Sequence, residues 1–371
     1  MCKFIKIFFT TLLIMFSVNT VVYADTLNEA IIAANCSDSD DASCNGECTQ
    51  TSNIITIETT GDNAGGVSDK DSGKAKDSCN EKPDEYRITF YKAGLCETDP
   101  YDATATLNPT ISKPEGNCYN FFVDEAGKAI SLAYDATTNS ITQTGNLITG
   151  SLNFELGTYN YAYVIVDNRL EVKHQQTYSK VMKGGDTGDT FFSSGVTCWT
   201  NGVTTTFTNA TGAQRGFSDL QVKDFGTDSQ VKGSDATASL AMDCGDTYEA
   251  SPVFNTEIIE NFADAPGDEN SNFVSNTGQS YESFNGTVDS AAAKLLKDDD
   301  LTTANSYLTA ARIFYPIRFA TPLIVTRETS VFEMSFGVSG SVSLDFSSDG
   351  ANKLIAIKAG ADPFTMKFTT R

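Results

Sequence analysis

Histidine and tryptophan are almost absent from this chain of 371 residues, which contains one of each. Because His174 stands alone, metal sites that need several imidazoles are excluded, and any histidine-dependent triad would rest on this one side chain. Its neighbours along the sequence are polar, so we expect His174 to be a solvated surface residue. The one tryptophan, Trp199, adjoins Cys198, and we expect its ring to pack against a disulfide.

Positive charge is also scarce. The chain carries 26 Lys and Arg against 48 Asp and Glu, a formal net charge of −22. A surface this acidic repels phosphate backbones, and no basic cluster offsets it, so we expect no nucleic-acid partner. The same charge favours solubility and suits a salty medium, in which it is screened.

Long apolar runs are confined to the N-terminus. Lys3 and Lys6 form a basic start, residues 7–16 are almost entirely apolar, and Val22-Tyr23-Ala24 ends in a small residue. This layout is typical of a secretory signal peptide over residues 1–24 and is short for a membrane-spanning helix. We therefore expect no membrane span after signal cleavage, and a secreted, cell-surface or periplasmic location.

The cysteines agree with export. Cleavage after residue 24 removes Cys2 and leaves eight, an even number that indicates disulfides in an exported chain. We pair Cys96 with Cys118 and Cys198 with Cys244, because each pair closes a loop within one domain. The other four then pair among themselves in one of three ways: Cys36, Cys44, Cys48 and Cys79.

Residues 25–82 form an acidic, cysteine-rich N-terminal arm. Residues 54–57 predict a strand, whereas residues 61–80 are polar and lack periodicity. Within that polar stretch, Asp69 and Asp71 stand at alternate positions before a glycine, as at the start of a calcium loop. The downstream glutamate of such a loop is missing, and a solvated acidic loop is the competing interpretation. We expect no other cofactor.

Residues 83–180 have the pattern of a β-sandwich, in which short strands alternate with Gly- and Asn-containing turns. Tyr86, Ile88 and Phe90 lie on one face of a predicted strand. Residues 159–166 are apolar on both faces, so we expect a central strand that is covered on both sides.

Residues 181–371 form a second β-rich domain. Its last strands alternate clearly over residues 332–338, and residues 364–368 close the chain. Apolar residues at helical spacing over residues 304–311 predict one helix, and residues 289–297 favour a shorter one. The chain is thus predicted to be mainly β, with two antiparallel β-sandwich-like domains, the N-terminal arm and one or two short helices.

Leu156-Gly157-Thr158-Tyr159 leads into the predicted central strand. With residues 86–90 as a first strand, this segment resembles the Leu-x-x-Gly-x-Tyr-like entry to a late strand of prealbumin-like exported sandwich domains, at a compressed spacing. The resemblance covers roughly residues 84–175. It implies a structural or binding module and transfers no catalytic residue.

Two short motifs look catalytic but lack their structural context. Asp186-Thr187-Gly188 matches an aspartic-protease tripeptide without its apolar flanks or a second copy, so a turn is the better interpretation. Residues 337–341 begin like a nucleophile elbow yet lack the final glycine and a following helix. Paired carboxylates for glycoside hydrolysis stay an alternative in so acidic a chain. We assign no catalytic residue.

These features predict an exported, non-enzymatic structural protein of the cell surface or extracellular space, in its sharpest form a self-assembling appendage or filament subunit. The alternatives are a secreted module that binds glycans or a receptor, and an extracellular hydrolase that uses carboxylates only. Residues 54–57 and 364–368 are predicted strands near the two ends of the chain. If either is an unpaired edge strand, it can bind another copy of the chain. The competing interpretation is that both segments complete sheets within their own chain.

Overall fold

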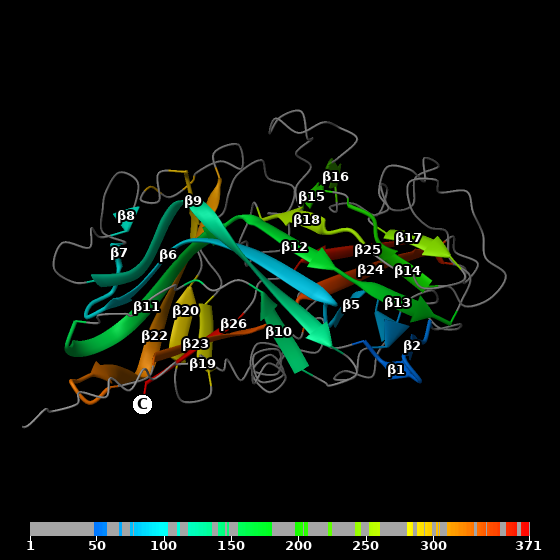
Figure 1. Cartoon of the computed structure of the whole chain (residues 1–371). Helices are drawn as coiled ribbons and strands as arrows, with labels where there is room; N and C mark the ends of the chain where they lie inside the picture. The colour runs from blue at the N-terminus through cyan, green and yellow to red at the C-terminus, as the bar shows by residue number, and fades with distance from the viewer. Residues whose placement is uncertain are drawn as a thin grey trace, which may run out of the picture.

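Strands make up all the regular secondary structure in the part of the chain that the computed structural model describes (Figure 1). The mainly β fold class predicted from the sequence is therefore confirmed. The described residues are 48–57, 67–68, 75–76, 78–102, 110–111, 118–135, 140–144, 147, 155–179, 197–202, 204–206, 222–224, 242–245, 252–259, 280–284, 288–292, 294–298, 302, 304, 310–329, 332–338, 340–348, 354–361 and 365–370.

A main sheet of 12 strands forms the frame of the molecule. Its strand β6 (Glu85–Cys96) pairs along one edge with β9 (Cys118–Asp135), which in turn pairs with β10 (Ser140–Thr144). Along its other edge, β6 pairs first with β12 (Arg169–Lys173) and then with β11 (Gly157–Asp167). One long strand therefore spans two consecutive partners.

The main sheet forks beyond β11 and β12. β11 pairs with β22 (Arg312–Val325), whereas β12 pairs with β18 (Asn255–Ile258). Each branch then continues through further short strands: β15 (Thr204–Thr206) and β16 (Val222–Asp224) beside β18, and β19 (Ser280–Phe284), β20 (Val288–Ala292) and β21 (Lys294–Leu296) beside β22.

Asn168, the one residue between β11 and β12, sits buried at this fork. Its N–H donates to the Ala311 carbonyl (3.2 Å), and its carbonyl accepts the N–H of Ile259 (2.8 Å). Its side-chain Nδ2 donates to the carbonyls of Ile259 (3.0 Å) and Ala310 (3.3 Å). One residue therefore ties the end of β18 to the start of β22.

β11 is the central, doubly covered strand that the sequence predicts. Ala162, Val164 and Val166 are buried in the main core, and Tyr163 and Ile165 are buried in a second apolar cluster on the opposite face. The register shifts between Tyr159 and Tyr161, so Tyr159 joins the main core instead of lying beside Tyr163.

Two small sheets pack on the core face of the main sheet. β23 (Phe332–Gly337) pairs with β26 (Thr365–Thr370), and β24 (Val342–Ser348) pairs with β25 (Leu354–Ala361) and β5 (Ser78–Glu81). The ring of Phe336 lies 5.2 Å from that of Phe90, and the ring of Phe332 lies 5.1 Å from that of Phe121. This stacking gives the molecule its sandwich-like layers.

A five-stranded sheet lies on the right of Figure 1, beside β24 and β25 and away from β22 and β23. Its order is β1 (Gln50–Thr51), β2 (Ile54–Ile55), β13 (Gln175–Tyr178), β14 (Thr197–Thr200) and β17 (Met242–Gly245). β2 pairs with β1 and with β13, so residues 54–57 complete a sheet within their own chain. Two minor pairs are β3 (Val67–Ser68) with β4 (Ala75–Lys76) and β7 (Tyr101–Asp102) with β8 (Thr110–Ile111).

The predicted helices are not found in the described residues. The helix over residues 289–297 is wrong, because β20 and β21 occupy most of that segment. Most of the helix expected over residues 304–311 lies outside the described residues; at its two ends, the N–H of Ala304 donates to the Leu295 carbonyl and that of Ala311 to the Leu296 carbonyl. In residues 289–297, burial of Leu295 and Leu296 against β22 overrides the local helical spacing.

The predicted domain segments share sheets. β11 and β12 come from residues 83–180, whereas their partners β22 and β18 come from residues 181–371. β5 of the N-terminal arm pairs with β24 near the C-terminus. The boundary expected near residue 180 therefore runs through one sheet and does not separate two.

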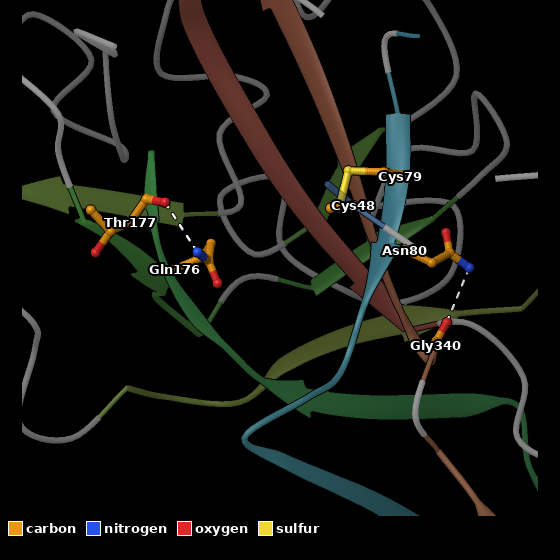
Figure 2. Close-up of a disulfide and its surroundings, with 6 residues drawn as sticks. All are labelled: Cys48, Cys79, Asn80, Gln176, Thr177 and Gly340. Carbon is orange, nitrogen blue, oxygen red and sulfur yellow. Dashed lines mark hydrogen bonds between the residues drawn. A yellow bond between two sulfur atoms is a disulfide. The ribbon is translucent and has the colours of Figure 1, made fainter. Parts of the chain in front are cut away.

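Three disulfides are present in the described residues. Cys96–Cys118 links the directly opposed ends of β6 and β9, and Cys198–Cys244 links β14 to β17. Both bridges were expected from the sequence. Cys48–Cys79, one of the pairings left open within the arm, attaches the start of the described chain to β5 (Figure 2). Cys36 and Cys44 lie outside the described residues.

Candidate functional site

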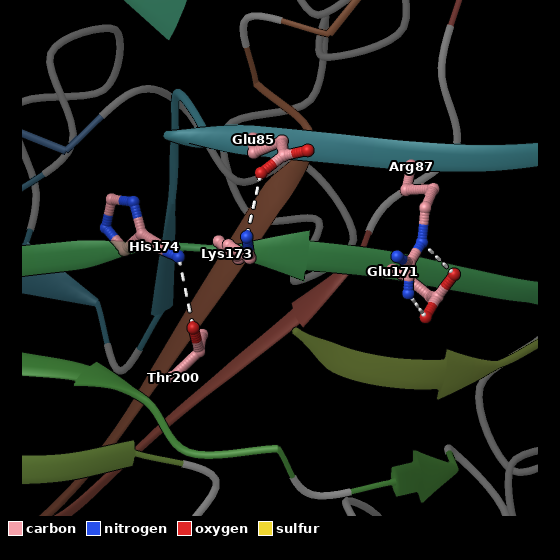
Figure 3. Close-up of polar contacts among 6 residues, drawn as sticks. All are labelled: Glu85, Arg87, Glu171, Lys173, His174 and Thr200. Carbon is pink, nitrogen blue, oxygen red and sulfur yellow. Dashed lines mark hydrogen bonds and ion pairs between the residues drawn. The ribbon is translucent and has the colours of Figure 1, made fainter. Parts of the chain in front are cut away.

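The candidate site is the joint at which the chain passes from the main sheet into the five-stranded sheet (Figure 3). β12 ends at Lys173 and β13 begins at Gln175, so His174 is the single residue between the two sheets. Residues 82–84, just before β6, lie against this passage. We define residues 82–84 and 173–175 together as the joint.

Asp84 is the hydrogen-bonding centre of the joint. Its N–H donates to the Lys173 carbonyl (2.9 Å), and its carbonyl accepts the N–H of Tyr134 (2.8 Å). Its Oδ2 accepts the N–H of Gln175 (2.8 Å). Burial raises the pKa of Asp84 to about 6, and the hydrogen bond from Gln175 opposes that shift. This carboxyl therefore changes charge near neutral pH while it holds strand β13.

His174 is buried, with 2% of its surface exposed, so the prediction of a solvated histidine is wrong. Strand alternation places it with Leu170 and Val172 on the core side, although its immediate neighbours in sequence are polar. Its N–H donates to Oγ1 of Thr200 (3.3 Å), and its carbonyl accepts the N–H of Thr200 (3.0 Å). Burial lowers the pKa of His174 to about 4, against a smaller opposite effect of the Lys82 backbone.

The outer face of the joint carries two ion pairs between directly opposed residues of β6 and β12. Arg87 donates through two guanidinium nitrogens to the carboxylate of Glu171, and Nζ of Lys173 lies 2.9 Å from Oε2 of Glu85. The hydrogen bond to Glu171 raises the pKa of Arg87. Both cations also lie over the ring of Phe254, at 4.0 and 4.3 Å from its centroid.

A second polar cluster lies farther along the same face. The Tyr91 hydroxyl donates to Asp167 (3.0 Å), and the guanidinium of Arg312 lies 3.8 Å from the centre of the Tyr91 ring. Burial, and then the negative charge of Asp167, raise the pKa of Tyr91. Burial, and then the positive charge of Arg312, lower the pKa of Lys92. The face is therefore a mixed network of charges and rings.

Buried side chains connect the small sheets to the main sheet. On β18, Asn255 and Glu257 point the same way: Asn255 donates to the Ala359 carbonyl (3.3 Å), and Glu257 accepts the N–H of Ala361 (2.6 Å). These two bonds supply partners to β25 along its edge toward β18. Elsewhere, Asn80 of β5 donates to the Gly340 carbonyl (3.0 Å), as Figure 2 shows. The same figure also shows the bond from the Gln176 side chain to the Thr177 carbonyl.

The sequence identified few of these residues. The alternation of Leu170 and Val172 with His174 is a signal that would have placed the histidine inside. Asp84 offers no such signal, because its role depends on strands that are distant in sequence. Trp199 lies on the strand face opposite Cys198, and its ring covers Gly245, where an added Cβ would come within 3.0 Å of it.

The other residues singled out from the sequence are placed as follows. Asp69 and Asp71 lie outside the described residues, as does Asp186-Thr187-Gly188. The elbow-like segment joins the end of β23 to β24 through a turn, and its Ser341 is buried. Within the described ranges, no three His, Cys, Asp or Glu side chains cluster in a way that would hold a metal ion.

No helix in the described portion of the chain is long and apolar enough to cross a membrane. Comparison with known proteins found no matching family model, no matching curated protein and no matching solved structure. The functional argument therefore rests on the chemistry and geometry of the chain alone.

Proposed function

We propose that the chain is an exported, non-enzymatic structural protein of the cell surface or extracellular space. The observation that carries the proposal is the set of three disulfides, two of which join paired strands while the third attaches residue 48 to β5. Disulfides persist in oxidising compartments, and each contributes on the order of 2–4 kcal/mol of stability. The burial of His174 argues against a histidine-dependent catalytic site, because a general base must reach its substrate.

More specifically, the chain is proposed to assemble with further copies of itself. Of the two predicted strands near the chain ends, residues 54–57 are enclosed between β1 and β13 and offer no edge. β26 pairs with β23 and with no other strand in the described residues. A strand from a second copy could bind along β26 through backbone hydrogen bonds.

Assembly can be tested by light scattering of protein released from cells without denaturation. Negative-stain microscopy would show the shape of any assembly. We expect oligomers or filaments from the full chain, and folded monomers after truncation behind Asp362, which removes β26. Circular dichroism would confirm that the truncated chain keeps its strands. A monomeric full-length protein at high concentration and in screening salt would refute assembly, and turnover of a polysaccharide would refute the non-enzymatic role.

A secreted glycan- or receptor-binding module is the second candidate. It is favoured by the outer face around Phe254, where Arg87 and Lys173 lie over an aromatic ring. Their guanidinium and ammonium N–H groups are hydrogen-bond donors that a polar ligand such as a sugar could contact. On a glycan array, a bound ligand that is lost with Phe254→Ala but kept with Phe332→Leu would select this function over a structural one.

We also propose Ca²⁺ as a ligand of the arm, through Asp69 and Asp71. Millimolar Ca²⁺ would raise the melting temperature by mass action, and a chelator would reverse the change. Mg²⁺ would do less, because it demands a tighter geometry. The double variant Asp69→Asn/Asp71→Asn is expected to abolish the effect, and an effect that persists in this variant would place the ion elsewhere.

A further inference from the structure

The joint between the main sheet and the five-stranded sheet carries an inference that does not depend on assembly. We propose that the joint is a pH-responsive coupling, in which the ionisation of Asp84 and of His174 sets how tightly the five-stranded sheet is held against the main sheet. Both groups lie at the one place where the chain passes directly from β12 to β13.

The geometry makes Asp84 a switch for β13. Its backbone bonds to Lys173 and Tyr134 attach it to β12 and β9 of the main sheet, whereas its carboxylate bonds to the first N–H of β13. Only the side-chain bond crosses into the five-stranded sheet. A change of charge at this carboxyl therefore acts on the connection between the sheets.

His174 acts on the same connection from the core side. Both of its backbone polar groups bond to Thr200 of β14, so the residue cannot move without disturbing the five-stranded sheet. Its ring is buried, and a proton added there would place a positive charge in the core. The two groups thus occupy one joint and respond to pH in opposite directions.

Several other ionisable groups lie around Asp84 and His174. Glu85 and Lys173 form an ion pair across β6 and β12, and Lys82 lies over the ring of Tyr134 from β9. Glu81 comes from β5, and Glu257, from β18, accepts the N–H of Ala361. No charge from any of these groups is among the causes of the shifts at Asp84 and His174, in which burial is the largest.

The direction of the response follows from linkage. The pKa of Asp84 is raised from 3.8 to about 6, so its stabilising effect is full below about pH 4 and is lost as the pH rises through 6. The pKa of His174 is lowered from 6.5 to about 4, so its stabilising effect is full above pH 6.5 and is lost as the pH falls through 4. Between about pH 4 and pH 6.5 each effect is partly lost, and no pH gives both in full, so the two groups oppose each other and each variant isolates one of them.

The chain carries its own reporter at this position. Its only tryptophan, Trp199, lies directly opposite Gln175 in the β13–β14 pair. Its fluorescence responds to the packing of the strand that Asp84 holds. Far-UV circular dichroism, which follows all the sheets together, would show whether the whole fold changes as well.

The test is a titration of Trp199 fluorescence from pH 8 to pH 3 in the full-length, disulfide-intact protein. We expect two transitions, near pH 6 and near pH 4, with the dichroism signal unchanged through the upper one. Asp84→Asn keeps an acceptor for Gln175 but does not ionise, so it removes the upper transition. His174→Gln removes the lower one. Glu97→Gln, at an exposed carboxyl beyond β6, is the matched control and changes neither.

Melting temperatures give a second measurement. Asp84→Asn is expected to melt a few degrees above the wild type at pH 7.5, where the wild type holds a buried charge, and the excess should vanish by pH 4. An upper transition that persists in Asp84→Asn with its midpoint unchanged would overturn the proposal. So would an Asp84→Asn melting difference that is constant across pH. If His174→Gln does not fold, Asp84→Asn still decides the question.

Discussion

Residues 157–173 pair with β6 of the main sheet, first through β11 and then through β12, yet these two halves are built in different ways. Around β11, both faces of the sheet are apolar: Val164 faces the main core, and Ile165 packs with Phe314 in the second cluster. Around β12, the outer face carries ion pairs, and the core side carries His174 near Thr200. Asn168 separates the halves at the fork.

The difference shows two ways of holding a strand in place. The apolar half depends on burial, which has no direction and tolerates changes of detail. The polar half depends on hydrogen bonds between particular side-chain atoms and distant backbone groups: the Asp84 carboxylate accepts the N–H of Gln175, and Asn255 donates to the Ala359 carbonyl. Such bonds contribute modestly when made and cost more when one partner is left buried alone. The polar half should therefore be less stable but more specific.

The largest effect is expected in the apolar half. Phe314 is fully buried beside Tyr163, with their ring centroids 5.8 Å apart. Phe314→Ala should lower the free energy of unfolding by about 3–5 kcal/mol, through lost burial and the cavity that remains. Phe254→Ala in the polar half should cost only about 1–2 kcal/mol, because that ring is partly exposed. Equal costs in denaturant unfolding would contradict the comparison.

The disulfides offer a second contrast, since one lies beside β11 and another lies in the five-stranded sheet that follows β12. Cys96–Cys118 closes a loop with a sequence separation of 22, and Cys198–Cys244 one with a separation of 46. Loop-closure entropy then predicts that replacing a pair by Ala costs about 3.4 and about 4.0 kcal/mol respectively. Urea unfolding of the two double variants measures both. A larger loss for the shorter loop would show that packing in the apolar half outweighs chain entropy.

The apolar half is also the half that the sequence predicts. Apart from Asn160, residues 159–166 are apolar on both faces, and this pattern correctly indicates a central strand. The register shift near Tyr159 has no such signal, because a bulge depends on the neighbouring strand. In the polar half, His174 and Asp84 receive their environments from β14 and β13. Local sequence therefore misplaced the histidine and missed the aspartate.

The helix predicted over residues 289–297 failed for a related reason. Its local spacing is helical, yet β20 and β21 occupy most of this segment and pair with β22. This long-range pairing decides the structure of the segment, and a local sequence pattern cannot report it. The bridges Cys96–Cys118 and Cys198–Cys244 could be predicted because each closes a loop within one predicted domain.

Asn168 tests the boundary between the halves. Asn168→Ala removes two side-chain donors and leaves the buried carbonyls of Ile259 and Ala310 without them, which should cost about 2–3 kcal/mol. Asn168→Asp should cost more at pH 7, because a carboxylate would face the two carbonyls, and should recover in acid, where a protonated carboxyl can donate to one of them. Equal unfolding free energies for both variants at pH 7 would mean that these bonds do not hold the fork.

The smallest effect is expected from the ion pair on the outer face of the polar half. Arg87 and Glu171 make a two-pronged contact, but their side chains stay 33% and 22% exposed, and solvent screens their attraction. A double-mutant cycle with Arg87→Met and Glu171→Gln should give a coupling energy of about 0.2–1 kcal/mol, falling as salt is added. The same cycle at Lys173 and Glu85 is the matched comparison, and it should give less, because a lysine makes a single contact where arginine makes two. A coupling above about 2 kcal/mol that salt does not reduce would mean that the outer face holds β12 as firmly as the core does. The contrast between an apolar half held by burial and a polar half held by directed bonds would then be wrong.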